Sequence, residues 1–307
     1  SDLAHLNPGS GLRSGSQPAD TPPSSPQSLP TLSPFPMLLE PWLIAELAIL
    51  GLCTGFLAGL LGIGGGMLMV PFVTIILTAR GVSPDLAVKM AIATSMATIV
   101  FTSISSVRAH HKRGAVQWGI VKNLAPGIVL GAMLASLGVF AVLKGTSLAL
   151  FFAAFVGFSA TQMLLDKKPA PTRTLPGPAG LLGSGGVIGF LSGLVGAGGG
   201  FVSVPFMTWC NVPMHQAVAT SAALGFPIAL ANVVGYVVAG QSVSGLPAGS
   251  VGYVFVPALA VIATASVLMA PLGVKAAHAL PVKQLKRVFA LILYALAAYM
   301  LYRGLSA

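Results

Sequence analysis

Two glycine-rich segments are the residues of this chain best suited to binding a ligand. They read Gly62-Ile-Gly-Gly-Gly and Gly196-Ala-Gly-Gly-Gly, and each precedes a short apolar segment that contains a proline. Successive glycines allow positive φ angles and several N–H groups in one concavity, and a helix that begins there adds the positive end of its dipole. Neither segment contains an acidic residue, so the pair indicates an anion site. The candidate residues are Gly62, Gly64, Gly65, Gly66, Pro71, Gly196, Gly198, Gly199, Gly200 and Pro205.

Two other functions of glycine-rich loops do not fit these segments. A dinucleotide-binding loop needs Gly-x-Gly-x-x-Gly, and Met67 stands where the first segment would need its last glycine. A phosphate-binding loop needs a lysine directly after its glycines, and neither segment has one. Close helix packing is the remaining alternative, and it is our interpretation of the preceding stripe of Gly51, Gly55 and Gly59.

A hydroxyl pair recurs after each glycine segment. Thr94-Ser95 and Thr220-Ser221 both follow an alanine inside an apolar stretch. Such hydroxyls often bond back to a carbonyl of the preceding helical turn. Their recurrence favours a second interpretation, in which one pair from each half faces a shared cavity at mid-membrane depth. We therefore add Thr94, Ser95, Thr220 and Ser221 to the candidate binding residues.

Few charged side chains lie inside the apolar segments. Lys89 and His215 stand shortly before the two Thr-Ser pairs, where a side chain can snorkel to the membrane interface, and they are candidates for gating or for attracting the substrate. Glu46 lies in the first turns of an apolar segment, where the helix dipole favours a carboxylate, and proton coupling is its candidate role. His110 and His111 belong to a basic loop, and we expect them to be solvated.

The composition predicts a polytopic membrane protein. Of the 307 residues, 55% are hydrophobic and only 7% are charged, against about a quarter charged in soluble domains. This ratio excludes a soluble enzyme, a disordered chain and a disulfide scaffold. The net charge of +10 is then best explained by loop charges that orient the chain in the membrane. Cys53 and Cys210 lie in apolar runs, and we interpret both as packing residues.

Ten apolar segments follow Trp42. Most of them are long enough to cross a hydrocarbon core of about 30 Å, whereas the second and the seventh are too short. The fold class that we expect is therefore an all-α polytopic membrane protein with two interrupted helices. The segments are 42–62, 67–79, 86–109, 118–143, 147–165, 180–196, 201–210, 215–239, 251–274 and 285–305.

The two halves of the chain repeat each other. Fourteen of the 24 positions in 51–74 are identical to the residues 134 positions later, and Ala93-Thr94-Ser95 recurs at an offset of 126 as Ala219-Thr220-Ser221. A duplicated unit of five segments is odd in number, so the second copy should be inverted in the membrane. The organisation that we expect is a disordered Pro/Ser/Gly-rich tail at 1–36, a first repeat at 37–165, a cytoplasmic linker at 166–179 and a second repeat at 180–307. Met37 is our hypothesis for the natural start.

Basic residues fall in alternate loops, as an inverted repeat requires. The loop after the third segment holds Arg108, Lys112 and Arg113, whereas its counterpart at 240–250 holds no charge. By the positive-inside rule, residues 108–114, 166–175 and 275–287 should be cytoplasmic. The 240–250 loop and the C-terminus should lie outside.

The doubled Gly-x-Gly-Gly-Gly-x-x-x-x-Pro motif, followed by Ala-Thr-Ser, resembles the TauE/SafE family of sulfite and organosulfonate exporters over residues 42–305. The resemblance implies a multi-pass permease of the bacterial cytoplasmic (inner) membrane that moves small sulfur-containing anions. The motif positions named above, with Thr94, Ser95, Thr220 and Ser221, carry the resemblance. One departure is the stretch between Pro71 and Thr94, which is longer than its counterpart in the second half.

The function that we expect is a secondary transporter that exports a small sulfur-containing anion, such as sulfite or an organosulfonate, by alternating access at a midplane site between the repeats. An anion channel or an uptake permease of the same fold is the alternative. No His-Glu-x-x-His motif, aspartate pair or nucleophile with a His partner suggests an enzyme. We expect no cofactor, metal or nucleic acid, and the partners should be the anion, the lipid bilayer and a second copy if the protein is a homo-oligomer.

Overall fold

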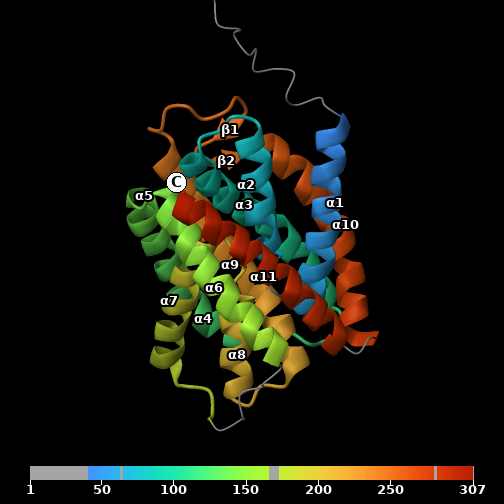
Figure 1. Ribbon diagram of the computed structural model, residues 1–307. Coiled ribbons are helices and arrows are strands. Elements are labelled where there is room, and N and C mark those ends of the chain that lie inside the picture. The colour runs from blue at the N-terminus through green and yellow to red at the C-terminus, as the bar shows by residue number, and fades with distance from the viewer. Residues whose placement is uncertain (1–40, 63–64, 166–172, 280–281, 307) are drawn as a thin grey trace, which may run out of the picture. The chain divides into compact units, whose positions relative to one another are not determined.

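The computed structural model describes residues 41–62, 65–165, 173–279 and 282–306. The predicted tail at 1–36, Gly64 and residues 166–172 of the predicted linker lie outside these residues. The described part is almost entirely helical (Figure 1). Its helices are α1 (Pro41–Leu61), α2 (Gly66–Ala79), α3 (Pro84–His111), α4 (Trp118–Met133), the π-helix η2 (Leu134–Val139), α5 (Phe140–Val142), α6 (Gly145–Leu165), α7 (Pro178–Val195), α8 (Gly200–Trp209), α9 (Met214–Gly240), α10 (Val256–Ala279) and α11 (Val282–Ser306).

The ten predicted apolar segments correspond to these helices. Within the described residues, eight helices are long and apolar enough to span a membrane, α4, η2 and α5 together forming one of them. The two short segments are the 14-residue α2 and the 10-residue α8. The ninth segment is the one whose boundaries differ from its helix by more than three residues. The ninth segment begins with an antiparallel hairpin of β1 (Ser250–Val251) and β2 (Val254–Phe255), so its helix starts at residue 256 rather than 251. The other boundaries agree within three residues, as in the sixth segment, whose helix α7 starts at Pro178 rather than at 180.

Glycine and proline set where the helices break. α2 and α8 each begin directly after a glycine in the left-handed region, Gly65 and Gly199, a conformation that other residues adopt only with strain. α3 begins with Pro84 in its first turn, after Ser83, which suits a residue without an N–H group. Most helices are apolar on all sides, as expected where one side faces neighbouring helices and the other faces lipid.

The central pair of helices is α3 and α9. They pack against each other, while α1 packs against α10, α4 against α7, and α6 against α11 (Figure 1). Glycines allow the close outer contacts: a Cβ added to Gly51 would lie 2.7 Å from the Ile262 carbonyl oxygen of α10, and one added to Gly185 would overlap the Leu124 carbonyl of α4. The glycine stripes therefore serve close packing, as predicted.

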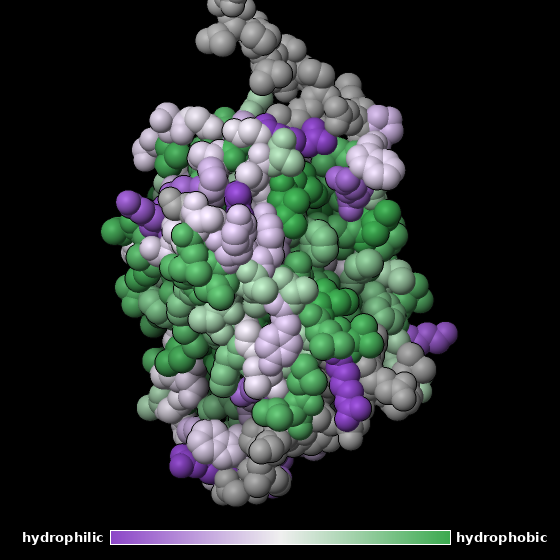
Figure 2. Space-filling view, viewed as in Figure 1, coloured by the Kyte–Doolittle hydropathy of each residue, from purple (hydrophilic) through white to green (hydrophobic). Residues whose placement is uncertain are grey.

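Hydrophobic side chains cover the middle of the face seen in Figure 2, and hydrophilic ones gather toward its two ends. Several large apolar residues are more than 60% exposed, among them Ile49, Phe158 and Leu268, which suits a lipid-facing surface. We call the end that carries β1 and β2 the hairpin end and the end that carries residues 173–177 the linker end (Figure 1). Basic Arg108, Lys112, Arg113 and Lys275 line one hollow at the linker end.

The two ends should lie on opposite sides of the membrane. Single cysteines at the exposed Ser244 and Lys112, in a background without Cys53 and Cys210, place one thiol at the hairpin end and one at the linker end. The charge asymmetry predicts that an impermeant maleimide labels S244C in intact cells and labels K112C only after lysis. Labelling of both positions from outside would contradict the predicted orientation.

Candidate functional site

The two glycine segments adopt the predicted backbone conformation. Gly62 and Gly65 have φ angles of 66° and 70°, and their counterparts Gly196 and Gly199 have 74° and 77°. Gly65 and Gly199 are the N-caps of α2 and α8. Leu68 and Val202 donate their N–H groups to the carbonyls of these two glycines, so the N–H groups of the first two residues of each helix are the ones that lack intrahelical partners. The prolines lie inside these helices. We call residues 62–66 and 196–200 the two glycine loops.

The two glycine loops meet in the interior of the helix bundle. A Cβ added to Gly66 would overlap the carbonyl of Gly196, so the loops touch through their backbones. A Cβ added to Gly62 would lie 2.5 Å from the carbonyl oxygen of Val218, a residue of α9 in the second half. Segments 130 or more residues apart in the chain therefore form one backbone-lined centre.

The two predicted serines fasten these loops crosswise. Ser95 of α3 donates a 2.9 Å hydrogen bond to the carbonyl oxygen of Gly196, and Ser221 of α9 donates a 3.0 Å bond to that of Gly62. Ser203 of α8 donates in turn to Ser221 over 2.8 Å. All three side chains are fully buried. The serines thus reach the opposite glycine loop instead of bonding back within their own helices.

The two predicted threonines are also used crosswise. Thr94 accepts a 3.0 Å hydrogen bond from the backbone N–H of Phe255, the residue before α10. Thr220 accepts a 3.0 Å bond from the backbone N–H of Gln117, the N-cap of α4. Each threonine of one half therefore ties down the start of a long helix in the other half.

The predicted charged residues differ in their surroundings. Lys89 is only 8% exposed. Its Nζ lies 5.7 Å and 5.5 Å from the ring centroids of Phe140 and Tyr253 and donates to a carbonyl of α5. Burial, and then the carboxylate of Asp85, raise the pKa of Tyr253, so its ring stays neutral. The cation is therefore held beneath aromatic rings at the hairpin end, and its predicted snorkelling is wrong.

The other two charged candidates are exposed, unlike Lys89. Its counterpart His215 is exposed in the first turn of α9, and Glu46 is exposed on α1. The expectation of two solvated histidines was wrong for His110, because α3 continues through it and leaves it 1% exposed.

If the glycine loops bind the anion as predicted, replacing Lys89 with Gln should reduce its affinity by about tenfold or less, because a cation outside the loops contributes a secondary, longer-range attraction of about 1.4 kcal/mol at most. Equilibrium binding of ³⁵S-sulfite to the purified protein measures the change. Lys144→Gln is the matched control, since Lys144 is exposed at the same end. Loss of all binding in Lys89→Gln alone would indicate a site centred on the lysine.

A small cavity opens beside the glycine loops. It lies between the end of α1, the middle of α3 and α9, and the second loop, and it has about 10 Å³ of space for the centre of a water molecule, about enough for one water. Three hydroxyl-bearing residues of α3 form its polar wall. The lining residues are Ala58, Gly62, Ile99, Thr102, Ser103, Ser106, Gly198, Ala222 and Gly225.

The family model described as "Sulfite exporter TauE/SafE" matches residues 47–300. The chain belongs to the TauE/SafE family. The match includes both glycine loops, both Thr-Ser pairs and the hydroxyl residues of α3.

Relatives of this TauE/SafE protein carry names that state transport only. A "probable membrane transporter protein" of Haemophilus influenzae is 37% identical over 82% of this chain and 96% of its own length. One of Methanocaldococcus jannaschii is 30% identical over 86% of this chain and 96% of its own length. No solved structure gives a significant match. The protein is thus a multi-pass membrane protein of a transporter family.

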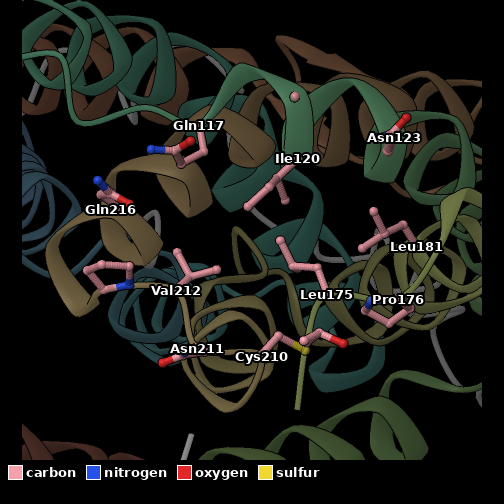
Figure 3. Close-up of a pocket in the computed structure, with 13 residues that line it drawn as sticks. Gln117, Ile120, Asn123, Leu175, Pro176, Leu181, Cys210, Asn211, Val212 and Gln216 are labelled. Atoms are coloured by element: carbon pink, nitrogen blue, oxygen red, sulfur yellow. The ribbon is translucent and has the colours of Figure 1, made fainter.

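A larger hollow lies at the linker end of this TauE/SafE chain. It has about 570 Å³ and is lined by the starts of α4, α7 and α9 and by the end of α8, with polar Gln117, Asn123 and Gln216 around it (Figure 3). Burial raises the pKa of Cys210 beside it, and Arg173 offsets part of that shift, so the thiol stays neutral near pH 7. Gln117 connects the hollow to Thr220.

Sequence reasoning did not single out the hydroxyl wall of the cavity. Ser106 follows Ser103 by three residues and Thr102 by four, so its side chain shares a face of α3 with both. That face continues from Ser95 through Thr98 toward the linker end. Helical spacing of hydroxyls within an apolar segment was the available signal, but the same spacing also fits bonds back to the preceding turn, which Thr98 and Thr102 make.

Proposed function

We propose that this TauE/SafE protein is a secondary transporter that exports a small sulfur-containing anion, such as sulfite or an organosulfonate, by alternating access at the meeting point of the glycine loops. The observation that carries the proposal is the contact of two loops, each at a helix N-terminus. First-turn N–H groups and helix dipoles favour an anion. Each charge-assisted N–H bond contributes about 1.5–3 kcal/mol, so a few can bind a small oxyanion without a fixed countercharge.

The proposed mechanism requires two inverted repeats. Contacts that each half makes with the other support this arrangement. By repeat position, α7 is the counterpart of α1, and α4 is the counterpart of α10. The contact of α1 with α10 therefore corresponds to the contact of α7 with α4, and the first helix of each half packs against a helix of the other half. The Ser95–Gly196 bond corresponds likewise to the Ser221–Gly62 bond. An inverted repeat relates the two access paths by symmetry, so that rocking one half against the other opens one path as it closes the other.

The longer first half makes the two proposed gates unequal. α2 has 14 residues, whereas its counterpart α8 has 10. Thr94 lies ten residues after the first residue of α3, whereas Thr220 lies six residues after the first residue of α9. One extra helical turn on each side of the α2–α3 connection thus accounts for the eight additional residues. The Lys89 cluster and the β1–β2 hairpin cover this taller end, and the hollow of Figure 3 lies at the other. This asymmetry favours loading from the linker end, which is the predicted cytoplasmic side.

Counterflow in proteoliposomes tests the proposed function. Vesicles loaded with unlabelled sulfite should accumulate external ³⁵S-sulfite transiently, because a carrier exchanges one anion for another. A channel would let the label equilibrate without overshoot. If the protein produces no flux of sulfite or of an organosulfonate, the proposed function is wrong.

A further inference from the structure

Basic side chains from α3 and α10 gather around the hollow of about 680 Å³ at the linker end, which we call the basic hollow. Arg108, Lys112 and Arg113 line it from the end of α3, and Lys275 lines it from α10. Arg113 donates a 2.8 Å hydrogen bond to the Val274 carbonyl, which joins the two sides. The other three cations are exposed and have no hydrogen bond or ion pair to the described part of the protein. Three positive charges are therefore free for a ligand.

No acidic side chain among the described residues offsets these charges. Glu46 and Asp85 are the acidic residues of the described part. Asp85 lies in the first turn of α3 and accepts from the N–H of Thr146, whereas the basic hollow lies where α3 ends. Glu46 lies near the start of α1, which runs parallel to α10, so it is close to the hairpin end as well. The basic hollow therefore attracts an anion without competition from a carboxylate.

An apolar groove continues from the basic hollow along the surface of the bundle. It has about 510 Å³ and is lined by Phe101 of α3 and by residues of α10 from Val256 to Leu268. Phe101 and Val267 line both spaces, so the basic hollow and the apolar groove are continuous. Phe101, Val256 and Leu268 are among the large apolar residues that stay exposed. A hydrophobic surface thus lies directly beside the free cations.

The polar groups along the apolar groove are already hydrogen-bonded. Pro271 has no N–H for the Val267 carbonyl, four residues earlier in α10, and Ser105 of α3 donates a 2.9 Å bond to that oxygen instead. The hydroxyl of Thr264, the polar residue in the lining of the groove, bonds to the Ala260 carbonyl. The surface that remains for a ligand is hydrocarbon, which suits an apolar chain better than a polar solute.

The length of the apolar groove suits an acyl chain. The sixteen residues from Leu259 to Lys275 of α10 rise about 24 Å at about 1.5 Å per residue. One leaflet contributes about half of a hydrocarbon core of about 30 Å. A chain whose head group lies at the cations can therefore follow the groove through the whole depth of its leaflet.

We propose that the basic hollow and the apolar groove together bind an anionic phospholipid of the linker-end leaflet. Its phosphate would lie among Arg108, Lys112 and Lys275, and an acyl chain would lie along α10. Basic pockets between membrane helices recognise acidic head groups in this way, and anionic lipids give the cytoplasmic leaflet its negative surface potential. The linker end is the predicted cytoplasmic side. This site is separate from the glycine loops and does not depend on which substrate the protein moves.

Native mass spectrometry of the delipidated full chain, titrated with single lipids, tests the head-group preference. The first dioleoyl phosphatidylglycerol should bind about tenfold or more tightly than the first dioleoyl phosphatidylcholine, because three free cations act on its net negative charge. Lys112→Gln combined with Lys275→Gln should remove about tenfold of the phosphatidylglycerol affinity and leave the phosphatidylcholine affinity unchanged. Both positions are exposed, so the thermal unfolding temperature should stay the same.

Lys122→Gln combined with Lys144→Gln is the matched control for the charges. It removes the same two charges from exposed positions outside the basic hollow, and the phosphatidylglycerol affinity should change by about twofold at most. If the two double variants lose affinity equally, net charge rather than the basic hollow attracts the lipid, and the inference is wrong.

Ala260→Phe tests the apolar groove. Ala260 is exposed and lines the groove, so a phenyl ring there would occupy the place of the acyl chain, and the phosphatidylglycerol affinity should fall about fivefold or more. Ala154→Phe, at an exposed position of α6, is the control and should bind this lipid normally.

Three other results would overturn the lipid site. Equal affinity for phosphatidylcholine and phosphatidylglycerol would show an unspecific hydrophobic surface. Displacement of the lipid by an excess of glycerol phosphate, with Ala260→Phe binding normally, would show a site for soluble anions. A dimer that Ala260→Phe separates would show that the groove is an interface between two copies of the chain. Because the titration contains no transport substrate, its outcome leaves the proposed function to the counterflow experiment.

Discussion

Gly65→Val and Gly199→Val are each expected to reduce sulfite exchange by about a hundredfold or more. Both glycines have positive φ angles as N-caps of the short helices, and a β-branched residue fits that conformation poorly. The helix start must then move, and with it the first-turn N–H groups. Loss of two charge-assisted bonds of about 1.5–3 kcal/mol each corresponds to that change in affinity.

The surroundings predict different stability costs for the two variants. A Cβ at Gly65 would lie 2.6 Å from the carbonyl oxygen of Thr54, a backbone atom of α1. A Cβ at Gly199 would instead meet the side chain of Ile228, which can change its rotamer. Gly65→Val should therefore unfold at a lower temperature than Gly199→Val, while both lose exchange.

Gly81→Val is the matched control for these two variants. Gly81 has a φ angle of 85°, but an added Cβ meets nothing within 4 Å, so the substitution adds similar backbone strain away from the loops. It should keep most of its exchange activity. If Gly81→Val is as inactive as the loop variants, or if both loop variants exchange normally, the glycine loops have a packing role rather than a binding role.

The helices were predictable because their signals are local. A hydrophobic run long enough to cross the membrane and a glycine that permits positive φ are both properties of a few adjacent residues. The ten segments and the conformations of Gly62, Gly65, Gly196 and Gly199 followed from such properties. The β1–β2 hairpin was missed because residues 250–255 are as apolar as the helix that follows.

The contacts of the candidate site were not predictable in the same way. The bonds of Ser95 to Gly196 and of Thr94 to Phe255 join residues more than 100 positions apart, and no local pattern specifies such partners. Lys89 was expected to reach the interface, yet rings from α5 and the β1–β2 hairpin cover it. The Ser106 hydroxyl, which has no hydrogen-bond partner among the described residues, likewise could be recognised only in the packed structure.

Thr94→Val combined with Thr220→Val should impair the protein more than Lys89→Gln does. Each threonine accepts a hydrogen bond from a backbone N–H at the start of α10 or α4, and valine has nearly the same shape without the oxygen. A buried N–H that loses its partner costs about 1–3 kcal/mol. The Phe255 N–H is buried and should lose that full amount, whereas the Gln117 N–H lies part-buried beside the linker-end hollow, where water can replace part of the lost bond. The double variant should therefore lose about 3 kcal/mol of the stability of the closed arrangement, most of it at the start of α10.

The chain offers a closely matched control for this pair. Thr74 and Thr208 are also repeat counterparts, but their hydroxyls bond to carbonyls within α2 and α8, so Thr74→Val with Thr208→Val leaves no N–H group unpaired. Counterflow and thermal unfolding of both double variants should show a severe defect in the first and a small one in the second. Equal defects in the two double variants would show that the crosswise threonine bonds do not hold the site together. A Lys89→Gln variant without affinity, beside an intact Thr94/Thr220 double variant, would show that the lysine at the hairpin end does.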